Sequence, residues 1–126
     1  MGDITIQERT QIFAIRVVKA YTELSQRNFD DAGKILSKQL LKSGTSIGAN
    51  CAEAIYAQSN KDFVSKYSIA LKEASESKYW MELMIKSNLV SSQKFSLMIE
   101  EVEIIIRILI AIIKKLKIKE LELSKE

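Results

Sequence analysis

The chain has 126 residues, a formal net charge of +3 and one cysteine, and it contains neither histidine nor proline. A chain of this length can bury a core without disulfides or a structural metal, so we expect a single domain over residues 1–126. The missing histidine removes the usual general base at neutral pH, the Ser-His and Cys-His nucleophile pairs and the common zinc ligand sets. We therefore expect a protein that is not an enzyme and needs no cofactor.

Four segments carry apolar residues at helical spacing, and they predict helices over about residues 4–26, 31–58, 61–87 and 92–119 or beyond. The polar connections between them are only a few residues long, so successive helices would be antiparallel neighbours. The predicted fold is all-α, an up-down-up-down antiparallel four-helix bundle. Residues 120–126 are expected to fray.

The first two segments each present one apolar face. In the first, this face comprises Ile6, Phe13, Val17, Ala20, Tyr21 and Leu24; in the second, it comprises Leu36, Leu40, Ile47, Cys51, Ala54 and Ile55. Gly44, Gly48 and Ala52 recur every four residues, on one stripe of the second helix. A glycine inside a helix costs roughly 1 kcal/mol relative to alanine, so we expect this stripe to admit a closely packed neighbour. Cys51 is expected to be a small buried residue, not a reactive thiol.

The third and fourth segments carry seams in which spacings of four and three alternate, as in left-handed helix packing. The third seam is Phe63, Tyr67, Ala70, Ala74, Ser77, Met81 and Met84; the fourth is Met98, Val102, Ile105, Leu109, Ile112 and Leu116. Five further isoleucines lie outside the fourth seam: Ile104, Ile106, Ile108, Ile110 and Ile113. A surface helix of a monomer needs only one apolar stripe. Either the fourth helix is deeply buried or its second stripe contacts another subunit, and we favour the subunit contact.

Two lysine clusters stand out in a charge distribution that is otherwise even. Lys34, Lys38 and Lys42 repeat every four residues on the second helix, and Lys114, Lys115, Lys117 and Lys119 gather near the end of the fourth. Such clusters are ordinarily solvated faces, which is the interpretation we favour. A ring of subunits would multiply them, however, and repeated basic patches can bind RNA or DNA phosphates without reading sequence.

The remaining motifs say less about function. The spacing of Glu100, Glu101 and Glu103 does not put three carboxylates on one helix face, so we expect a solvated acidic turn and not a metal cage. The most apolar run, residues 104–113, is interrupted by Arg107 and is far shorter than the roughly 20 residues of a membrane span. The first residues show no apolar signal core. We expect a soluble cytoplasmic protein with no membrane contact.

The stretch from Ser43 to Trp80 carries a family resemblance. Ser43, Ser46, Ile47, Asn50, Ala52 and Glu53 form an S-x-x-S-I-x-x-N-x-A-E pattern, which continues through Asp62, Phe63, Ile69, Ala70, Glu73, Ala74, Glu76 and Trp80. This pattern resembles the bacterial four-helix-bundle proteins first noticed in intervening sequences of 23S ribosomal RNA genes. A related bundle is the accessory protein of diversity-generating retroelements, a basic pentameric barrel that works with a reverse transcriptase and its RNA.

The resemblance implies a cytoplasmic bundle that assembles into a ring, typically a pentamer, and it assigns no catalytic residues. We expect Asn50, Glu53, Glu73 and Glu76 to supply polar contacts between helices, because buried polar groups need partners. The favoured function is a non-catalytic, homo-oligomeric structural or adaptor protein. The alternative is an RNA-binding accessory protein that uses the lysine clusters and has a reverse transcriptase as a partner.

Overall fold

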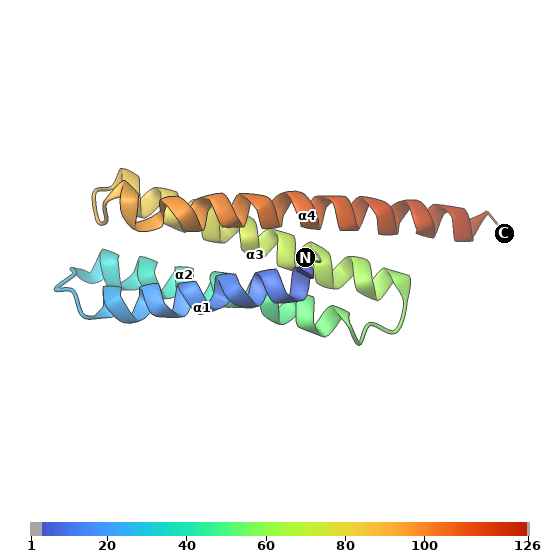
Figure 1. Cartoon of the computed structure of the whole chain (residues 1–126), viewed down its shortest axis with the longest axis horizontal. Coiled ribbons are helices and arrows are strands. Elements are labelled where there is room, and N and C mark those ends of the chain that lie inside the picture. The colour runs from blue at the N-terminus through green and yellow to red at the C-terminus, as the bar shows by residue number, and fades with distance from the viewer. Residues whose placement is uncertain (1–3, 126) are drawn as a thin grey trace.

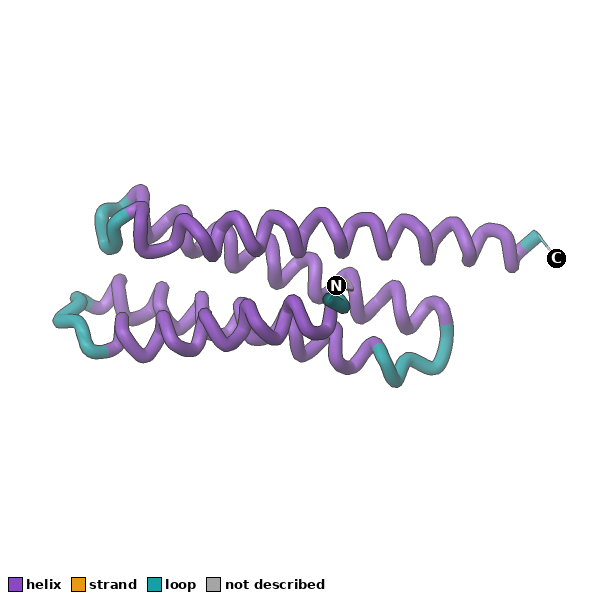
Figure 2. The backbone as a smooth tube through the Cα atoms, in the orientation of Figure 1, coloured by secondary structure: helices purple, strands orange, loops and turns teal. Residues whose placement is uncertain are grey.

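The computed structural model describes residues 4–125, which form four helices joined by short loops (Figures 1 and 2). These are α1 (Ile6–Ser25), α2 (Asp31–Ala54), α3 (Asn60–Lys86) and α4 (Ser92–Ser124). Successive helices run antiparallel, as Figure 1 shows, and no strand occurs within the described residues. The predicted all-α four-helix bundle is confirmed.

Polar side chains set the helix starts. Thr5, Asp30 and Ser59 each accept a hydrogen bond from the backbone N–H three residues later, at 3.0, 3.0 and 3.1 Å. These bonds satisfy N–H groups that have no partner within the helix. Between α3 and α4 the chain reverses through Asn88, whose φ of 62° is a left-handed conformation that asparagine tolerates better than most residues.

One predicted helix end is wrong. The second helix ends at Ala54 and not at residue 58, because the N–H groups of residues 55–57 bond three residues back and tighten the last turn, after which Ser59 caps α3. The fourth helix continues past residue 119 to Ser124, and residue 126 of the segment expected to fray lies outside the described residues. Its last turns are rich in lysine, glutamate and leucine, which favour the helix, and they contain no glycine.

The core lies along the axis of the bundle, where every helix contributes fully buried side chains such as Phe13, Ile47, Met81 and Ile105. The predicted seam of α3 is confirmed from Tyr67 to Met84, with Phe63 partly buried. Two expectations fail at the edges. Ile55 is exposed because α2 has already ended, and Ile113 replaces Ile112 as the buried residue of its turn in α4. A straight helix with 3.6 residues per turn drifts away from a 3.5-residue seam, which explains this second shift.

Gly44 and Gly48 of the small-residue stripe face α1, so the closely packed neighbour expected from the sequence is α1. A Cβ added to Gly44 would lie 2.7 Å from Val17 Cγ2, and one added to Gly48 would lie 3.3 Å from the backbone oxygen of Thr10. Both distances are too short for comfortable packing, so a side chain at either position would push α1 outward. Glycine here sets the distance between the two helices.

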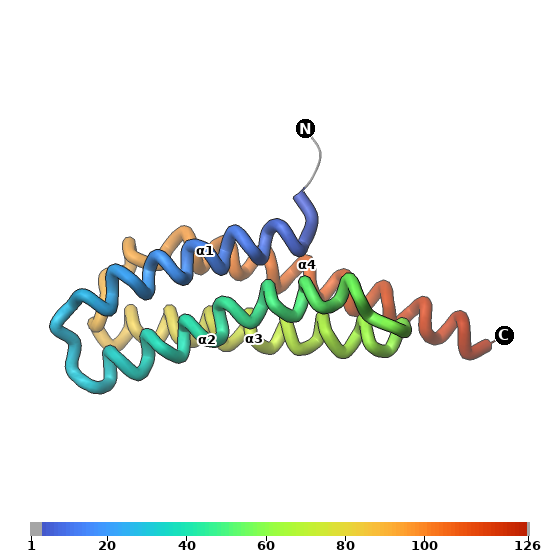
Figure 3. Tube along the Cα trace, turned by 90° about the horizontal axis from the view of Figure 1, so that it is seen from below, coloured from blue at the N-terminus to red at the C-terminus, as the bar shows by residue number. Residues whose placement is uncertain are grey.

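The helices pack unevenly around the bundle. Contacts are extensive between α1 and α2, between α2 and α3, and between α3 and α4, but sparse between α4 and α1. The last turns of α4 also project past the loop between α2 and α3 (Figures 1 and 3). The bundle is therefore least tightly packed on the side between α1 and α4, and the C-terminal end of α4 projects beyond the other helices.

Candidate interaction surfaces

No enzyme-like centre stands out in residues 4–125. Within this range no three His, Cys, Asp or Glu side chains are grouped to hold a metal, and no helix could span a membrane. Cys51 is fully buried, and this burial raises the pKa of its thiol to about 11. The thiolate, which is the nucleophilic form, is therefore scarce at neutral pH. The features that remain are surfaces, cavities and contacts between helices.

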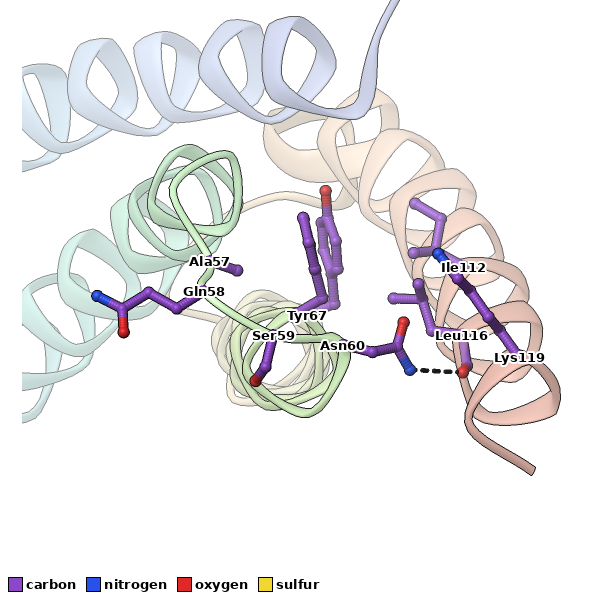
Figure 4. A pocket seen from close by; sticks show the side chains of 9 residues that line it. Ala57, Gln58, Ser59, Asn60, Tyr67, Ile112, Leu116 and Lys119 are labelled. Carbon is purple, nitrogen blue, oxygen red and sulfur yellow. Dashed lines mark hydrogen bonds between the residues drawn. The ribbon is translucent and has the colours of Figure 1, made fainter. Parts of the chain in front are cut away.

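A cavity of about 460 Å³ lies where the chain turns from α2 into α3. Figure 4 shows Tyr67 of α3 facing Ile112 and Leu116 of α4 across it. Two of the polar side chains here already have protein partners. Tyr67 Oη accepts from Gln7 Nε2 at 3.0 Å, and Asn60 Nδ2 donates to the Leu116 carbonyl oxygen at 2.9 Å. Lys119 also lines the cavity, but a single ammonium group does not make the convergent set of polar groups that a typical ligand site has.

The predicted polar quartet does not come together as expected. Asn50 donates to the Ser46 carbonyl oxygen of its own helix at 2.9 Å. Glu53 does join two helices, because it pairs with Lys66 of α3 at 3.0 Å. Burial and the neighbouring charge of Glu76 raise the pKa of Glu73. Among the described residues, none of the four bonds to another.

Other side chains make the polar contacts between helices. Gln7 Nε2 donates both to Tyr67 Oη and, at 3.1 Å, to the Cys51 carbonyl oxygen, which joins α1 to α3 and α2. Ser77 and Ser43 share a buried hydrogen bond of 3.0 Å between α3 and α2. The sequence analysis did not identify Gln7 as a contact between helices. The only sign of this role in the sequence is that Gln7 is a polar residue next to the apolar positions of the first helix.

The second apolar stripe predicted on α4 divides between several environments. Ile113 is only 8% exposed and belongs to the core, and Ile106 packs against the core. Ile104 and Ile108 are half-buried, and Ile110 is 49% exposed. Ile110 also lines a hollow with Leu71 of α3, so it faces away from α1.

Ion pairs connect α1 and α4 on the side where the bundle packs least. Arg16 pairs with Glu101, and Lys94 pairs with Glu23 at 2.7 Å. The hydrogen bond from Lys94 lowers the pKa of Glu23. Exposed ion pairs of this kind typically contribute less than about 1 kcal/mol each. They link the two helices at the surface but supply little of the apolar burial that holds the other sides together.

Apolar side chains flank these ion pairs. Ile12 lies one turn from Arg16 on α1, and Leu97 and Ile104 lie one turn to either side of Glu101 on α4, with Ile108 a turn further. Because Arg16 and Glu101 are paired, these four apolar residues belong to one surface, which we call the α1–α4 face. Two of its members, Ile12 and Leu97, are exposed.

Both predicted lysine clusters are exposed. Lys34, Lys38 and Lys42 lie on the outside of α2, and Lys114, Lys115, Lys117 and Lys119 lie on α4. None of the seven pairs with a carboxylate within 4.0 Å in residues 4–125, whereas Lys66, Lys78 and Lys94 do. Their role in binding nucleic acid stays a prediction.

Comparison with known proteins agrees with the fold. The sequence profile of the 23S rRNA-intervening sequence protein family matches residues 3–111. The chain belongs to this family. A crystal structure of a protein of unknown function from the S23 ribosomal protein family of Bacteroides thetaiotaomicron is 40% identical and superimposes with a TM-score of 0.79. The alignment covers 87% of this chain and 99% of that one. No curated protein matches the chain.

The family match includes the Ser43–Trp80 stretch, the α1–α4 face and the first lysine cluster. It ends at residue 111, so the second lysine cluster and the last turns of α4 lie outside it. This boundary separates two kinds of surface. One accompanies the family fold, and the other belongs to the extension of α4 beyond the matched region.

Proposed function

We propose that this member of the 23S rRNA-intervening sequence protein family is a non-catalytic, cytoplasmic scaffold or adaptor that works as a homo-oligomer. The α1–α4 face is the observation that supports the proposal most directly. It exposes aliphatic side chains along the side where the bundle packs least. Contiguous exposed apolar side chains are typical of protein interfaces.

A ring is the assembly that this face and the family resemblance favour. The proposed subunit number, five, comes from the resemblance to the ring-forming bundles. In a ring, each subunit uses two different surfaces, one toward each neighbour. The α1–α4 face would be one of these surfaces, because it runs along the length of the bundle and can pack against a helix of the next subunit.

The test is the absolute mass in solution, measured by light scattering after gel filtration. A pentamer of the 14.3 kDa chain has a mass of about 72 kDa, five times that of one chain. Ile12→Glu combined with Leu97→Glu should reduce this mass, because both side chains are exposed on the α1–α4 face. The control is Ile35→Glu, which changes an exposed isoleucine on α2. A wild-type monomer at micromolar concentration would contradict the proposal.

A second candidate function rests on the unpaired lysines. We propose, as the alternative, an RNA-binding accessory protein that acts with a reverse transcriptase. Charge reversal of Lys34, Lys38 and Lys42 should then weaken RNA retardation in gels. Wild-type binding should fall steeply with salt, because each neutralised phosphate releases a counterion. Lys72→Glu is the control, since Lys72 is also exposed and unpaired within residues 4–125. Retardation that is equal in all variants would exclude the α2 cluster.

A further inference from the structure

Arg9 is a cation on the side between α1 and α4 that has no anionic partner in residues 4–125. Arg16, seven residues further along α1, pairs with Glu101 of α4, so Arg9 lies on the same flank of its helix. The α4 residue level with Arg9, seven positions after Glu101, is Ile108 and not a carboxylate. Arg9 is half-buried, and its Nε is buried without a hydrogen-bond partner among the described residues. A charge in such a place favours a carboxylate from outside the chain.

A second seam on α3 lies on its flank toward α2. Its members recur at alternating spacings of four and three, and we call them the α2–α3 edge: Ile69, Glu73, Glu76 and Trp80. Lys66, seven residues before Glu73, pairs with Glu53 of α2 at 3.0 Å, which places this flank beside α2. Ile69 is exposed and the other three are half-buried. The edge is therefore part of the surface of a single chain.

The α2–α3 edge carries the charge that Arg9 lacks. Neither Glu73 nor Glu76 makes an ion pair within the described part of the chain. Burial and the charge of Glu76 raise the pKa of Glu73, while Lys72 and Lys42 act in the opposite sense. Because these two lysines balance the two glutamates, the edge has no large excess of charge that would repel a second copy. A cation in contact with Glu73 would stabilise its carboxylate.

The two sides carry matching groups at the same spacing. Arg9 and Arg16 are seven residues apart on α1, and Glu73 and Trp80 are seven residues apart on α3. Both spacings correspond to about 10 Å along the helix axis. Because α1 and α3 run in the same direction (Figure 1), two copies placed side by side with parallel axes present these groups in the same order. Arg9 then meets a carboxylate, and Arg16 meets an indole ring, whose face attracts a guanidinium group.

The heights of these groups along the bundle also agree. Gln7 of α1 donates to Tyr67 of α3, so these two residues lie level with each other. Counted from this bond, Glu73 lies about one helical turn further along the axis than Arg9. The equal spacing gives the second contact the same offset, so one small tilt between neighbouring subunits aligns both contacts.

We propose that the α2–α3 edge of one subunit covers the α1–α4 face of the next, with Arg9 paired to Glu73 of the partner subunit and Arg16 against Trp80 of the partner subunit. This assignment rests on the homo-oligomer of the proposed function and names the second surface that each subunit uses. Close packing joins each helix to only two others, so the two surfaces lie on opposite sides of the bundle and can be used at once. Such a heterologous contact forms a ring when its rotation closes.

Exchange of the two charges tests the contact in the full-length protein. Arg9→Glu alone and Glu73→Arg alone should each lower the wild-type mass toward the 14.3 kDa of one chain, because each places like charges opposite one another. The combined variant restores opposite charges and should recover the wild-type mass. Glu82→Arg is the matched control and should leave the mass unchanged. Glu82 is another half-buried glutamate of α3, without an ion pair in residues 4–125, and it lies nine residues from Glu73 on the opposite flank.

Two outcomes of the charge exchange would count against the contact. Circular dichroism first checks that each variant keeps its helical content. Failure of the combined variant to recover the wild-type mass would overturn the pairing of Arg9 with Glu73. An equal loss of mass in Glu82→Arg would overturn it as well, because the effect would then not be specific to the α2–α3 edge.

Trp80 provides an independent test, because it is the only tryptophan of the chain. Ile12→Glu combined with Leu97→Glu, which breaks the assembly at the α1–α4 face, should also shift the fluorescence emission of Trp80 to longer wavelength as water reaches the indole. Dissociation without this shift would overturn the inference and leave the homo-oligomer of the proposed function intact. A monomeric wild type would overturn both.

Ile35, the control position of the proposed function, lies outside the α2–α3 edge. Ser43 and Ser77 share a hydrogen bond, so they lie level with each other. Counted from this bond, Ile35 is about 7 Å further along the bundle than Trp80. Ile35→Glu should therefore change neither the mass nor the emission, and a change in both would overturn the boundary of the contact.

Discussion

The α2–α3 side and the α1–α4 side of the bundle use similar helices differently. Between α2 and α3, small residues such as Ala70 and Ala74 are fully buried, and the serines Ser43 and Ser77 share a hydrogen bond away from water. Between α1 and α4, ion pairs lie at the surface and the apolar side chains of Ile12 and Leu97 stay exposed. Helical periodicity on both sides is the same, so the pattern alone does not determine which apolar residue is buried. The number of neighbouring helices around each position decides this.

The largest expected effect contrasts one isoleucine from each side. Ile47→Ala should lower the free energy of unfolding by about 2–5 kcal/mol, because Ile47 is fully buried and its loss leaves a cavity. Ile12→Ala should change it by less than about 0.5 kcal/mol, because Ile12 is 44% exposed. Urea unfolding measures the free energy of both variants, with the protein dilute enough for any assembly to dissociate. Similar losses in the two variants would mean that α1 is buried against α4 after all.

Gly44 offers the next largest change. Gly44→Ala gains up to about 1 kcal/mol of helix propensity, but the new Cβ would lie 2.7 Å from Val17. Overpacking of this kind typically costs about 1–3 kcal/mol, so we expect a net loss. Thermal unfolding followed by circular dichroism should show a lower midpoint. A higher midpoint would indicate that α1 can move away from α2 without penalty.

The buried serine pair should contribute less. Ser77→Ala removes the hydrogen bond to Ser43. The Ser43 hydroxyl is then left with only a weak contact to the Leu40 carbonyl oxygen, at 3.4 Å. The expected loss is about 1 kcal/mol, the usual net value of one hydrogen bond. The double variant with Ser43→Ala should cost less than the two single changes together. Additive losses would show that the two hydroxyls are not coupled.

The smallest effect belongs to the α1–α4 ion pairs. Glu23→Gln removes the carboxylate that pairs with Lys94 and Arg27, at a cost below about 1 kcal/mol. Because folding lowers the pKa of Glu23 below its usual value of 4.5, its contribution is present above that value and is lost as the pH falls through the folded pKa. Wild type and variant should therefore differ in stability at pH 7 and converge in acid. A difference independent of pH would exclude the carboxylate charge as the cause.

Much of the fold could be read from the sequence because the signals are local. Caps such as Asp30 and Ser59, and the seam from Tyr67 to Met84, depend on residues close together in the chain. The exchange of Ile112 for Ile113 could not be foreseen, because it depends on how a straight helix drifts along its neighbours. The bonds of Gln7 and Asn60 link residues more than forty positions apart, and no spacing rule reports them.

The same limit applies to the surfaces. The lysine clusters were visible as spacings, and the structure places them where solvent reaches them. The α1–α4 face was only partly anticipated. Its α4 members Ile104 and Ile108 were predicted from the sequence to take part in self-association, but Ile12 and Leu97 were not, because the partner helix of each stripe depends on the tertiary register.

The single cysteine gives this bundle an internal reporter. Cys51 is fully buried on α2, close to Thr10 of α1, and its pKa of about 11 keeps it protonated at neutral pH. A thiol reagent can modify it only when the helices around it separate, and no second thiol competes for the reagent. The rate of modification therefore measures how often the α1–α2 interface opens transiently. Assembly through the face on the other side of α1 should slow that rate in proportion to the fraction of chains assembled.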